Sequence, residues 1–527
     1  MTMISVGSFM SMIGLQVHTQ YSTAPGNTAY ITAAFDYLNP QGLQGTGPYT
    51  LRDDTTGSVS KLTALCSARP NLRLDIYQGY APGSNYYSTW SGFMNSLPSG
   101  KIRIVEGMLE VDNPSWGFNN VNASYTNKAG ATYYGWQGVI AAQADLWGDW
   151  KLKAQVALWS LALPSSGSAT SQAVTAASNL GLSIPSIAHL SNVHFYASGG
   201  QCCTPQFTWD INTSTGYAIN LPVAFTEFGF VDTTSGNVDN YYGTPTVNAK
   251  YMLNMLCLMA SYGVKLGVIY EVLDDSQYGT DQDHFGIFST SGAAKAPATT
   301  LRNFCSIVAD ASTNAVSYTP TAYPVTVTGL PNTTRLASGT VPYGFYVQMQ
   351  SADGSNYIVV CIDATIYPNG STVTASPYNI TVTLPSSATT IQVYDPISGT
   401  SPISTSSGTS VTVSVSDHPI IIKIPGSGAG APPSISYEGT VITPGGATIT
   451  DVSSNTWSIS GGGQMVVNGS TDATTSGVTR AVYFKRWVYY ENGSAQWFGK
   501  NTTGGSWGSA ITSENFAALV LSTLAAR

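Results

Sequence analysis

Residues 101–113 read KIRIVEGMLEVDN, an apolar run of strand length that leads to a glutamate, Glu110, and then passes into loop residues. The same arrangement recurs at residues 221–230, LPVAFTEFGF, where Glu227 closes the apolar run. Parallel barrels place their reacting groups at the carboxyl ends of their strands. Cleavage of a glycosidic bond needs two carboxyl groups, one to protonate the leaving oxygen and one to attack the anomeric carbon or activate water. The two stretches therefore predict a pair of carboxyl groups on the rim of one barrel.

A single glutamate at a strand end is more often an ordinary loop residue, so the surrounding pattern has to support this interpretation. Apolar runs and amphipathic segments alternate from about residue 10 to residue 310. The strand candidates are Gly14–Thr19, Tyr49–Arg52, Arg73–Tyr77, Ile102–Glu106, Lys153–Leu158, Asn192–Tyr196, Val223–Glu227 and Lys265–Tyr270. The clearest helix candidates are Thr132–Leu146, Ser171–Asn179, Val247–Tyr262 and Pro297–Val308. The pattern predicts an α/β fold, a (β/α)8 TIM barrel over residues 1–315. A doubly wound open sheet is the alternative, and the lack of a Gly-rich phosphate motif after the first strand weakens it.

The helical pattern stops after the barrel region. Short alternating apolar runs between residues 316 and 425 predict an antiparallel β-sandwich. Residues 426–434 contain only Gly, Ser, Ala and Pro, which is typical of a linker. Residues 435–527 predict a small β-rich module. Its four tryptophans, Trp457, Trp487, Trp497 and Trp507, would either bind carbohydrate or fill a small core.

The composition excludes several classes of partner. Only 9% of the 527 residues are charged, the net charge is −8, and 20 Lys and Arg residues form no basic patch, so we expect no nucleic-acid partner. No apolar run is long enough to span a membrane, so we expect no membrane partner. The six cysteines show no CxxC spacing and there are only five histidines, so we expect no metal site and no cofactor. Cys257 and Cys305 lie in apolar helical runs and should be buried, whereas a Cys202–Cys203 disulfide stays open.

The surface composition bears on where the protein works. Gly, Ser, Thr, Asn and Tyr replace the missing charged residues. Such surfaces are common in proteins that act on glycans outside the cell, so we expect a secreted or extracellular protein. The first residues show no positively charged segment followed by an apolar one, so the route of export stays open.

Further polar and aromatic residues close the predicted strands. Because strand ends of a parallel barrel meet at one rim, these residues should converge with Glu110 and Glu227. They are His18, Arg52, His194, Tyr196, Tyr270 and Asp274.

Several motifs, taken together and in this order, resemble the clan A glycoside hydrolases, which are retaining TIM-barrel enzymes. Residues 106–112, EGMLEVD, are similar to the clan's E-G-x-N-E-P-D, whose second Glu is the acid/base. Residues 226–229, TEFG, are similar to its T-E-[FY]-G nucleophile motif. Residues 270–275, YEVLDD, together with 284–288, HFGIF, and 295–297, KAP, resemble its eighth-strand ending. The resemblance covers roughly residues 10–425 and looks closest to family 39 and family 5-like members with an appended β-sandwich.

This resemblance implies a retaining β-glycoside hydrolase that cleaves a polysaccharide or oligosaccharide by double displacement. Glu227 would be the nucleophile and Glu110 the acid/base. Arg52 would keep Glu227 ionised, and Tyr196 would donate a hydrogen bond to it. His194 would line the neighbouring sugar subsite, and Trp116, just past Glu110, would be a platform for a sugar ring. The alternative for both His18 and His194 is a hydrogen-bonded barrel residue that never touches substrate.

The chain departs from the clan's motif beside the acid/base. The usual Asn is Leu109 and the usual Pro is Val111. In the family that Asn binds the sugar 2-hydroxyl, so the substrate's 2-position is open. The alternative function is a non-catalytic glycan-binding protein on a degenerate glycosidase barrel, such as an adhesin or a phage tail component. An inverting hydrolase is a further alternative, and the separation of the two carboxyl groups distinguishes it.

Overall fold

The structure is a computed structural model of the whole chain. It describes residues 3–79, 86–112, 124–161, 167–196, 203–208, 211, 221–232, 242–276, 279, 281–312, 314–332, 342–426, 441–446, 448–451, 455–484, 487–501, 506–513 and 516.

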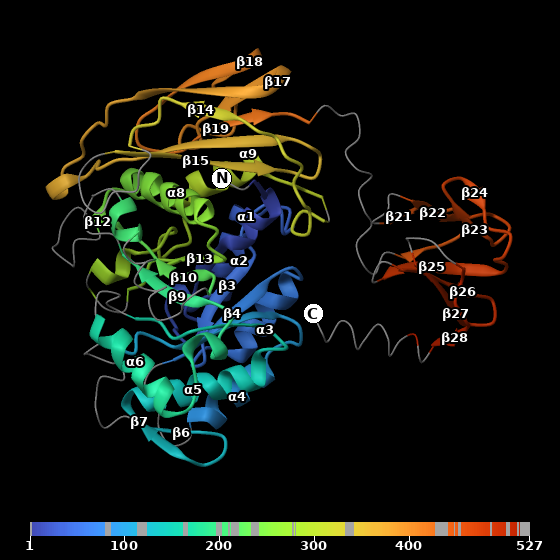
Figure 1. Cartoon of the computed structure of the whole chain (residues 1–527), viewed down its shortest axis with the longest axis horizontal. Helices are drawn as coiled ribbons and strands as arrows, with labels where there is room; N and C mark the ends of the chain where they lie inside the picture. Colours follow the sequence, from blue (N-terminus) through green and yellow to red (C-terminus); the bar gives the residue numbers. More distant parts are fainter. Residues whose placement is uncertain are drawn as a thin grey trace.

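Eight parallel strands form a barrel in the first 310 residues (Figure 1). They are β2 (Ile13–Gln16), β3 (Thr50–Asp54), β4 (Arg73–Gln78), β5 (Ile102–Met108), β8 (Gln155–Ala157), β9 (Ser191–Phe195), β10 (Val223–Phe228) and β13 (Leu266–Ile269). Each strand pairs with the next one of the set, and β13 returns to β2. A parallel bridge between Ala157 and Leu190 joins β8 to the start of β9 and closes the ring. The predicted TIM barrel is confirmed, and the open doubly wound sheet is wrong.

Helices connect these strands and surround the barrel (Figure 1). They are α2 (Thr28–Leu38), α3 (Val59–Ala68), α4 (Tyr86–Ser96), α5 (Gly135–Trp150), α6 (Gly167–Asn179), α8 (Pro245–Ser261) and α9 (Ala296–Val308), with short 3-10 turns η1 (Ala24–Gly26), η2 (Ile184–Ile187) and η3 (Asp281–His284). Side chains cap the N-termini of several of these helices. The Ser58 hydroxyl accepts a hydrogen bond from the Lys61 amide at the start of α3, and the Thr244 hydroxyl accepts one from the Val247 amide at the start of α8. Two small sheets lie in the loops: β6 (Ser124–Thr126) and β7 (Thr132–Tyr134) form an antiparallel hairpin, and β11 (Val231–Asp232) and β12 (Tyr242–Gly243) form a parallel pair. In the described part of the chain, no helix has the length and apolar character that crossing a bilayer requires.

The second unit is the expected β-sandwich. Its strands are β14 (Thr326–Thr328), β15 (Tyr343–Gln350), β16 (Asn356–Asp363), β17 (Tyr378–Tyr394), β18 (Ser404–Val415) and β19 (Ile420–Ile424), with one 3-10 turn, η4 (Pro368–Gly370). The long strand β17 pairs with β14 through its first half and with β19 through its second half, so it belongs to both layers. One further strand comes from the start of the chain, because β1 (Ile4–Ser5) pairs in parallel with β15 before the chain enters α1 (Val6–Met12).

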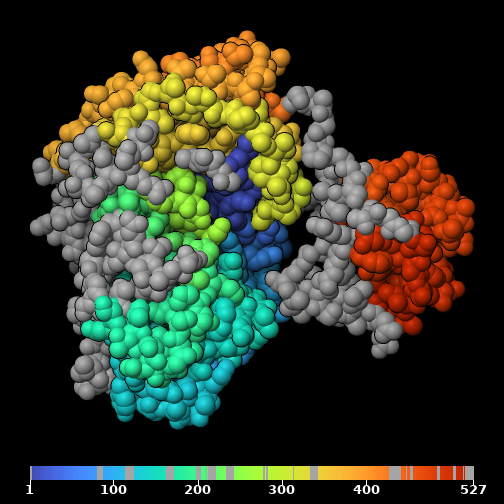
Figure 2. Space-filling model, in the orientation of Figure 1, coloured from blue at the N-terminus to red at the C-terminus, as the bar shows by residue number. Residues whose placement is uncertain are grey.

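The sandwich packs directly on the barrel, and Figure 2 shows it covering one end of that body. The two units share one continuous hydrophobic core, which contains both Met255 of α8 and Phe345 of β15. Polar contacts fix the interface. The Asn254 amide donates to the Ile362 and Asp417 carbonyls at 3.1 and 3.0 Å, and Thr204 donates from its hydroxyl to Asp363 at 2.6 Å. The interface therefore has both the apolar area and the specific hydrogen bonds of a fixed domain contact.

A charged cluster next to this interface makes stability depend on pH. His418 lies between Asp417 at 2.6 Å and Asp395 at 3.2 Å, and Asp417 also pairs with Lys250 of α8 at 2.8 Å. Burial alone would lower the pKa of His418, but its hydrogen bonds to the two aspartates raise it. Burial alone would raise the pKa values of both aspartates, but the same hydrogen bonds lower them.

We expect the contribution of this cluster to the free energy of unfolding to be highest between about pH 4 and pH 6.5. The contribution of His418 is complete below its ordinary pKa of about 6.5 and is lost as the pH rises through its raised value. The contribution of the aspartates is present above about pH 3.9 and is lost as the pH falls through their lowered pKa values. His418→Gln should cost about 2–3 kcal/mol near pH 5 and flatten the decline above pH 6.5 in urea unfolding. An unchanged alkaline decline in this variant would contradict the expectation.

The third unit is a small β module. Its strands are β20 (Val441–Ile442), β21 (Ile449–Thr450), β22 (Thr456–Ile459), β23 (Met465–Val467), β24 (Ser470–Thr471), β25 (Val478–Phe484), β26 (Trp487–Asn492), β27 (Gln496–Asn501) and β28 (Ile511–Thr512), arranged in two antiparallel sheets. Trp457 and Trp497 are buried, and Trp507 packs partly buried on the core around Trp457. Trp487 is half-buried and stacks on Tyr489. Three of the four tryptophans thus contribute to packing.

Candidate active site

The barrel interior is built in layers by the alternation of side chains along each strand. The lowest layer is apolar and contains Ile104, Ala157, Leu190, Ala224, Leu266 and Val268. Two residues further along β5, β9 and β10, the interior positions become polar, at Glu106, Asn192 and Thr226. This second layer is completely buried and contains Gln16, Arg52, Asp75, Glu106, Asn192 and Thr226.

A bulge in β10 brings Glu227 to the interior. Phe225 pairs with Val193, but Glu227 pairs with His194, so Thr226 is the extra residue on β10. Strict alternation would place neighbouring residues on opposite faces. Here Thr226 donates to the Asn192 side chain at 2.6 Å and Glu227 accepts from Arg52 at 2.8 Å, so both point inward. The bulge therefore provides one anchoring group and one reactive group from consecutive residues.

Arg52 connects the buried layer to Glu227. Its Nη1 donates to Glu227 Oε1 at 2.8 Å and to Gln16 Oε1 at 2.7 Å. Its Nε and Nη2 donate to the two oxygens of Glu106, so that the pair is bidentate. The guanidinium also lies over the Tyr77 ring, 4.0 Å from its centre. With no exposed surface and all these partners, Arg52 is fixed in position with its guanidinium against Glu227.

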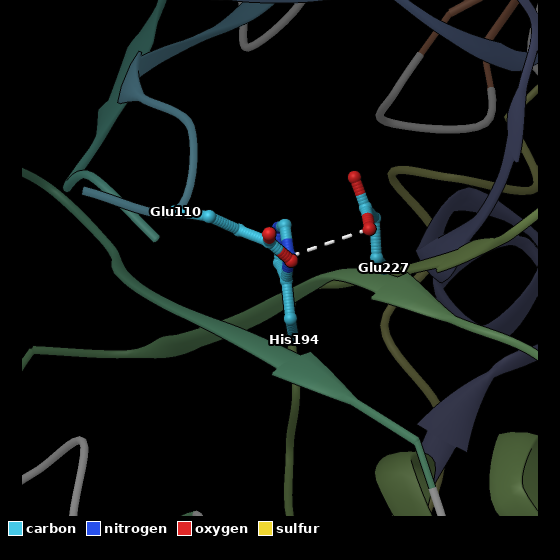
Figure 3. Close-up of side chains that lie close together, drawn as sticks. All are labelled: Glu110, His194 and Glu227. Atoms are coloured by element: carbon cyan, nitrogen blue, oxygen red, sulfur yellow. Dashed lines mark hydrogen bonds and ion pairs between the residues drawn. The ribbon is translucent and has the colours of Figure 1, made fainter. Parts of the chain in front are cut away.

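Glu110 and Glu227 meet at His194 (Figure 3). His194 Nδ1 lies 3.1 Å from Glu110 Oε1 and 3.3 Å from Glu227 Oε2. One carboxylate oxygen of Glu110 lies within 4.8 Å of one oxygen of Glu227. Tyr196 donates its hydroxyl to Glu227 Oε2 at 2.8 Å. The predicted pair of glutamates, together with Arg52, His194 and Tyr196, thus forms one cluster.

The backbone of Glu110 has an unusual conformation. Its φ is 40°, in the left-handed region that a residue with a side chain rarely adopts. Ser160, in the loop after β8, holds this segment with two hydrogen bonds. The Glu110 amide donates to the Ser160 hydroxyl at 2.9 Å, and the Val111 amide donates to the Ser160 carbonyl at 3.2 Å. Such backbone strain is concentrated at functional sites, where the surrounding structure maintains it. Side-chain exposure of 14% leaves Glu110 accessible from the barrel mouth, whereas that of His194 is 1%.

The electrostatics of the cluster change the pKa values of His194 and Tyr196. Burial would lower the pKa of His194, but the charge of Glu227 and the hydrogen bond with Glu110 raise it. Burial and the charge of Glu227 raise the pKa of Tyr196 well above its ordinary value. Tyr196 therefore stays a neutral hydrogen-bond donor. His194 can be protonated in its position between the two carboxylates.

The remaining predicted residues have other partners or lie elsewhere. His18 pairs with Glu271 at 3.3 Å, rather than with Glu110 or Glu227, and stacks on Tyr21. Tyr270 packs edge-on against both His18 and Tyr196, which places it at the wall of the site. Asp274 pairs with Lys295 at 2.7 Å. Trp116 and Cys202 lie outside the described residues.

Sequence reasoning missed the buried layer beneath the site, above all Glu106 and Asn192. Asn192 donates to Glu106 Oε2 at 2.9 Å and to the Leu158 carbonyl at 3.0 Å, so it links three strands. Both residues occupy interior positions of strands that had been recognised, and two-residue alternation counted back from His194 would have found Asn192.

The three residues Glu110, His194 and Glu227 are close enough together to be considered as metal ligands. Nδ1 of His194 already lies between the carboxylates and Tyr196 donates to Glu227, whereas no partner among the described residues reaches the buried Nε2 of His194. The positive charge of Arg52 against Glu227 also opposes a cation at this point.

No protein-family model matches the chain, and neither does any curated protein. Solved structures with a similar arrangement include a glucosidase from Croceicoccus marinus, at 9% identity over 80% of this chain and 97% of that one, with a TM-score of 0.49. A family 39 glycoside hydrolase from the gut symbiont Bacteroides cellulosilyticus WH2 has 11% identity over 80% of this chain and 82% of that one, with a TM-score of 0.45. A family 17 β-1,3-glucanosyltransferase from Rhizomucor miehei has 12% identity over 55% of this chain and 97% of that one, with a TM-score of 0.40. At these identities each comparison describes a likeness and assigns no activity to this chain.

Proposed function

We propose that the chain is a retaining β-glycoside hydrolase that acts on a polysaccharide or oligosaccharide. The observation that carries the proposal is the pair Glu110 and Glu227, which have carboxylate oxygens within 4.8 Å of one another. Arg52 and Tyr196 both donate hydrogen bonds to Glu227. Retaining hydrolases hold their carboxyl groups about 5–5.5 Å apart, and inverting ones about 6.5–9.5 Å apart to make room for water. The short gap favours direct attack by a carboxylate.

The environments of the two glutamates suggest their roles. Glu227, held by Arg52 and Tyr196, is the nucleophile that attacks the anomeric carbon and forms a glycosyl ester. Glu110 donates a proton to the leaving oxygen, and in the second step it accepts a proton from the water that cleaves the ester. His194 contacts both and stabilises whichever carboxylate is charged at each step.

The anomeric form of the first product tests this proposal. We expect an activated aryl β-glycoside to release the β-sugar first, as followed by proton NMR before mutarotation. A first-formed α-sugar would show inversion and overturn the double displacement. Tight binding of glycan with no turnover across a panel of aryl β-glycosides and polysaccharides would favour the glycan-binding alternative, which Leu109 beside Glu110 keeps open.

The composition supports a place outside the cell for this activity, since a surface poor in charge and rich in hydroxyl, amide and aromatic groups suits contact with glycans. Secretion or extracellular exposure is therefore part of the proposal. Detection of the protein in the medium or at the cell surface of the producing organism would test it.

Removal of the third unit should leave the chemistry intact. We expect a chain ending at Gly426 to turn over a short soluble aryl glycoside within about twofold of the full chain, because the barrel and sandwich share their core without it. If the module binds glycan, the truncated chain should show a lower apparent affinity for a polysaccharide in a pull-down, because the module of the full chain raises the effective concentration of the barrel at the polymer. An insoluble or inactive truncated protein would contradict the independence of the module.

A further inference from the structure

One buried acid in the barrel has no role in the steps above. Asp75 lies on β4 with no exposed surface, and it is paired in register with Arg52 on β3. Its carboxyl group also contacts Glu106, which belongs to the neighbouring strand β5. Asp75 thus stands beside the ion pair that holds Arg52 against Glu227.

The hydrogen-bond donors are divided unequally between the two touching acids. Glu106 accepts from Arg52 at both of its oxygens and from the Asn192 amide at 2.9 Å. No donor among the described residues reaches either oxygen of Asp75. An ionised carboxylate buried without a donor costs several kcal/mol, and two touching carboxylates cannot both stay ionised. Since Glu106 has three donors and Asp75 has none, the shared proton belongs on Asp75.

The charges around Asp75 agree with this assignment. The groups that face it are Glu106, Arg52 and, more weakly, Arg103, whose guanidinium donates to Thr50 at 2.9 Å and to the Ser11 carbonyl. Arg52 already serves two carboxylates, Glu106 and Glu227. Burial and the charge of Glu106 raise the pKa of Asp75 well above its ordinary value, against the opposing effects of the two arginines.

We propose that Asp75 is protonated in the working protein and donates a hydrogen bond to Glu106, which makes it a positioning residue for Arg52 and, through Arg52, for Glu227. The positioning role rests on the proposed function, whereas the protonated state does not. A proton on Asp75 supplies a further donor to Glu106 and leaves Arg52 shared between two carboxylates rather than three. Loss of that proton would place a second negative charge beside Glu106 and draw Arg52 away from Glu227.

The sign of the pH effect follows from the raised pKa. The contribution of Asp75 to stability is complete below its unfolded pKa of about 3.9, and it is lost as the pH rises through the folded value. Asp75→Asn is permanently neutral and keeps an N–H donor for Glu106. The variant should therefore lose less stability than the wild type between about pH 4 and pH 9 in urea unfolding.

Infrared spectroscopy of the full chain tests the protonated state directly. The wild type at neutral pH should show the carbonyl stretch of protonated carboxylic acids more intensely than D75N, because the proton of the acid/base Glu110 is present in both proteins and that of Asp75 only in the wild type. Asp472→Asn in the third unit is the matched control, because Asp472 binds Lys500 and Trp507, its pKa is lowered, and its loss should leave the band unchanged. A wild type without the band at neutral pH, or a D75N variant whose band is as intense as that of the wild type, would overturn the proposal. If D75N does not fold, Asp75→Ala provides the same comparison.

Kinetics test the positioning role separately. D75N should keep kcat within about threefold, whereas Asp75→Ala, which leaves Glu106 without this donor, should lower kcat by about tenfold with little change in KM. Equal kcat values and equal pH profiles for the two variants would overturn the positioning role. If the wild type turns over no glycoside, the infrared band and the pH dependence of unfolding still decide the state of Asp75, so the two proposals fail in distinguishable ways.

Discussion

Glu227→Gln is expected to lower the turnover of an activated aryl β-glycoside by on the order of 10⁴-fold or more. An amide is neutral and does not attack the anomeric carbon, so the covalent step is lost. The glutamine has nearly the same shape, and its one carbonyl oxygen can still accept from Arg52 or from Tyr196, so the fold should remain intact. Initial rates measured beside a melting curve separate loss of chemistry from loss of fold.

A matched control is available in the third unit. Glu491 pairs with Arg480 at 2.6 Å, far from the barrel in sequence, and Glu491→Gln is the same chemical change. It should leave turnover unchanged. Mass spectrometry adds a positive result, because a slow fluorinated aryl glycoside should label the peptide that carries Glu227 in the wild type and not in E227Q. Near wild-type turnover by E227Q would rule out Glu227 as the nucleophile.

Glu110→Ala is expected to show an effect that depends on the leaving group. Turnover of an unactivated oligosaccharide should fall by about 10²–10⁴-fold, because the leaving oxygen then departs without a proton. A dinitrophenyl glycoside has a leaving group that needs no proton, so formation of the glycosyl ester should change little and its hydrolysis should become limiting. Rates across a series of aryl leaving groups measure this dependence.

Azide distinguishes the two glutamates. In Glu110→Ala the small anion occupies the space left by the side chain and attacks the glycosyl ester, which restores turnover and yields a β-glycosyl azide. In Glu227→Ala azide replaces the nucleophile itself and yields the α-azide. A β-azide from the Glu227 variant would reverse the assignment of the roles.

The barrel was predictable because its signal is local and repeated. Each predicted strand, such as Ile102–Glu106, is a short apolar run next to a helical segment, and each is found in the ring. The helix predicted from Thr132 begins at Gly135 instead, because Thr132–Tyr134 pair with Ser124–Thr126 as a hairpin. That pairing is a tertiary contact, which a window of helical periodicity does not detect.

The rim of the site was predictable, but the support beneath it was not. Glu227 and Arg52 were recognised from strand-end positions and from motifs, and the structure brings them into contact. Glu106 looks in the sequence like one more residue of an apolar strand. Only the closure of the barrel makes it the bidentate partner of Arg52. His18 was placed with the glutamates on the same strand-end reasoning, but its neighbour Glu271 binds it instead. Strand-end position therefore identifies the rim, and the choice of partner on the rim depends on side-chain geometry.

The pairing of β1 with β15 has a consequence for synthesis of the chain. Ile4 and Ser5 leave the ribosome before the whole barrel does, whereas their partners Met349 and Gln350 leave after it. At about 5–20 residues per second, β1 waits roughly 20–70 s for its partner strand. During that interval its backbone groups are an open edge available to other chains. The barrel and sandwich thus complete their shared sheet only after nearly the whole of both has been translated, so a ribosome that stalls in the barrel leaves β1 exposed.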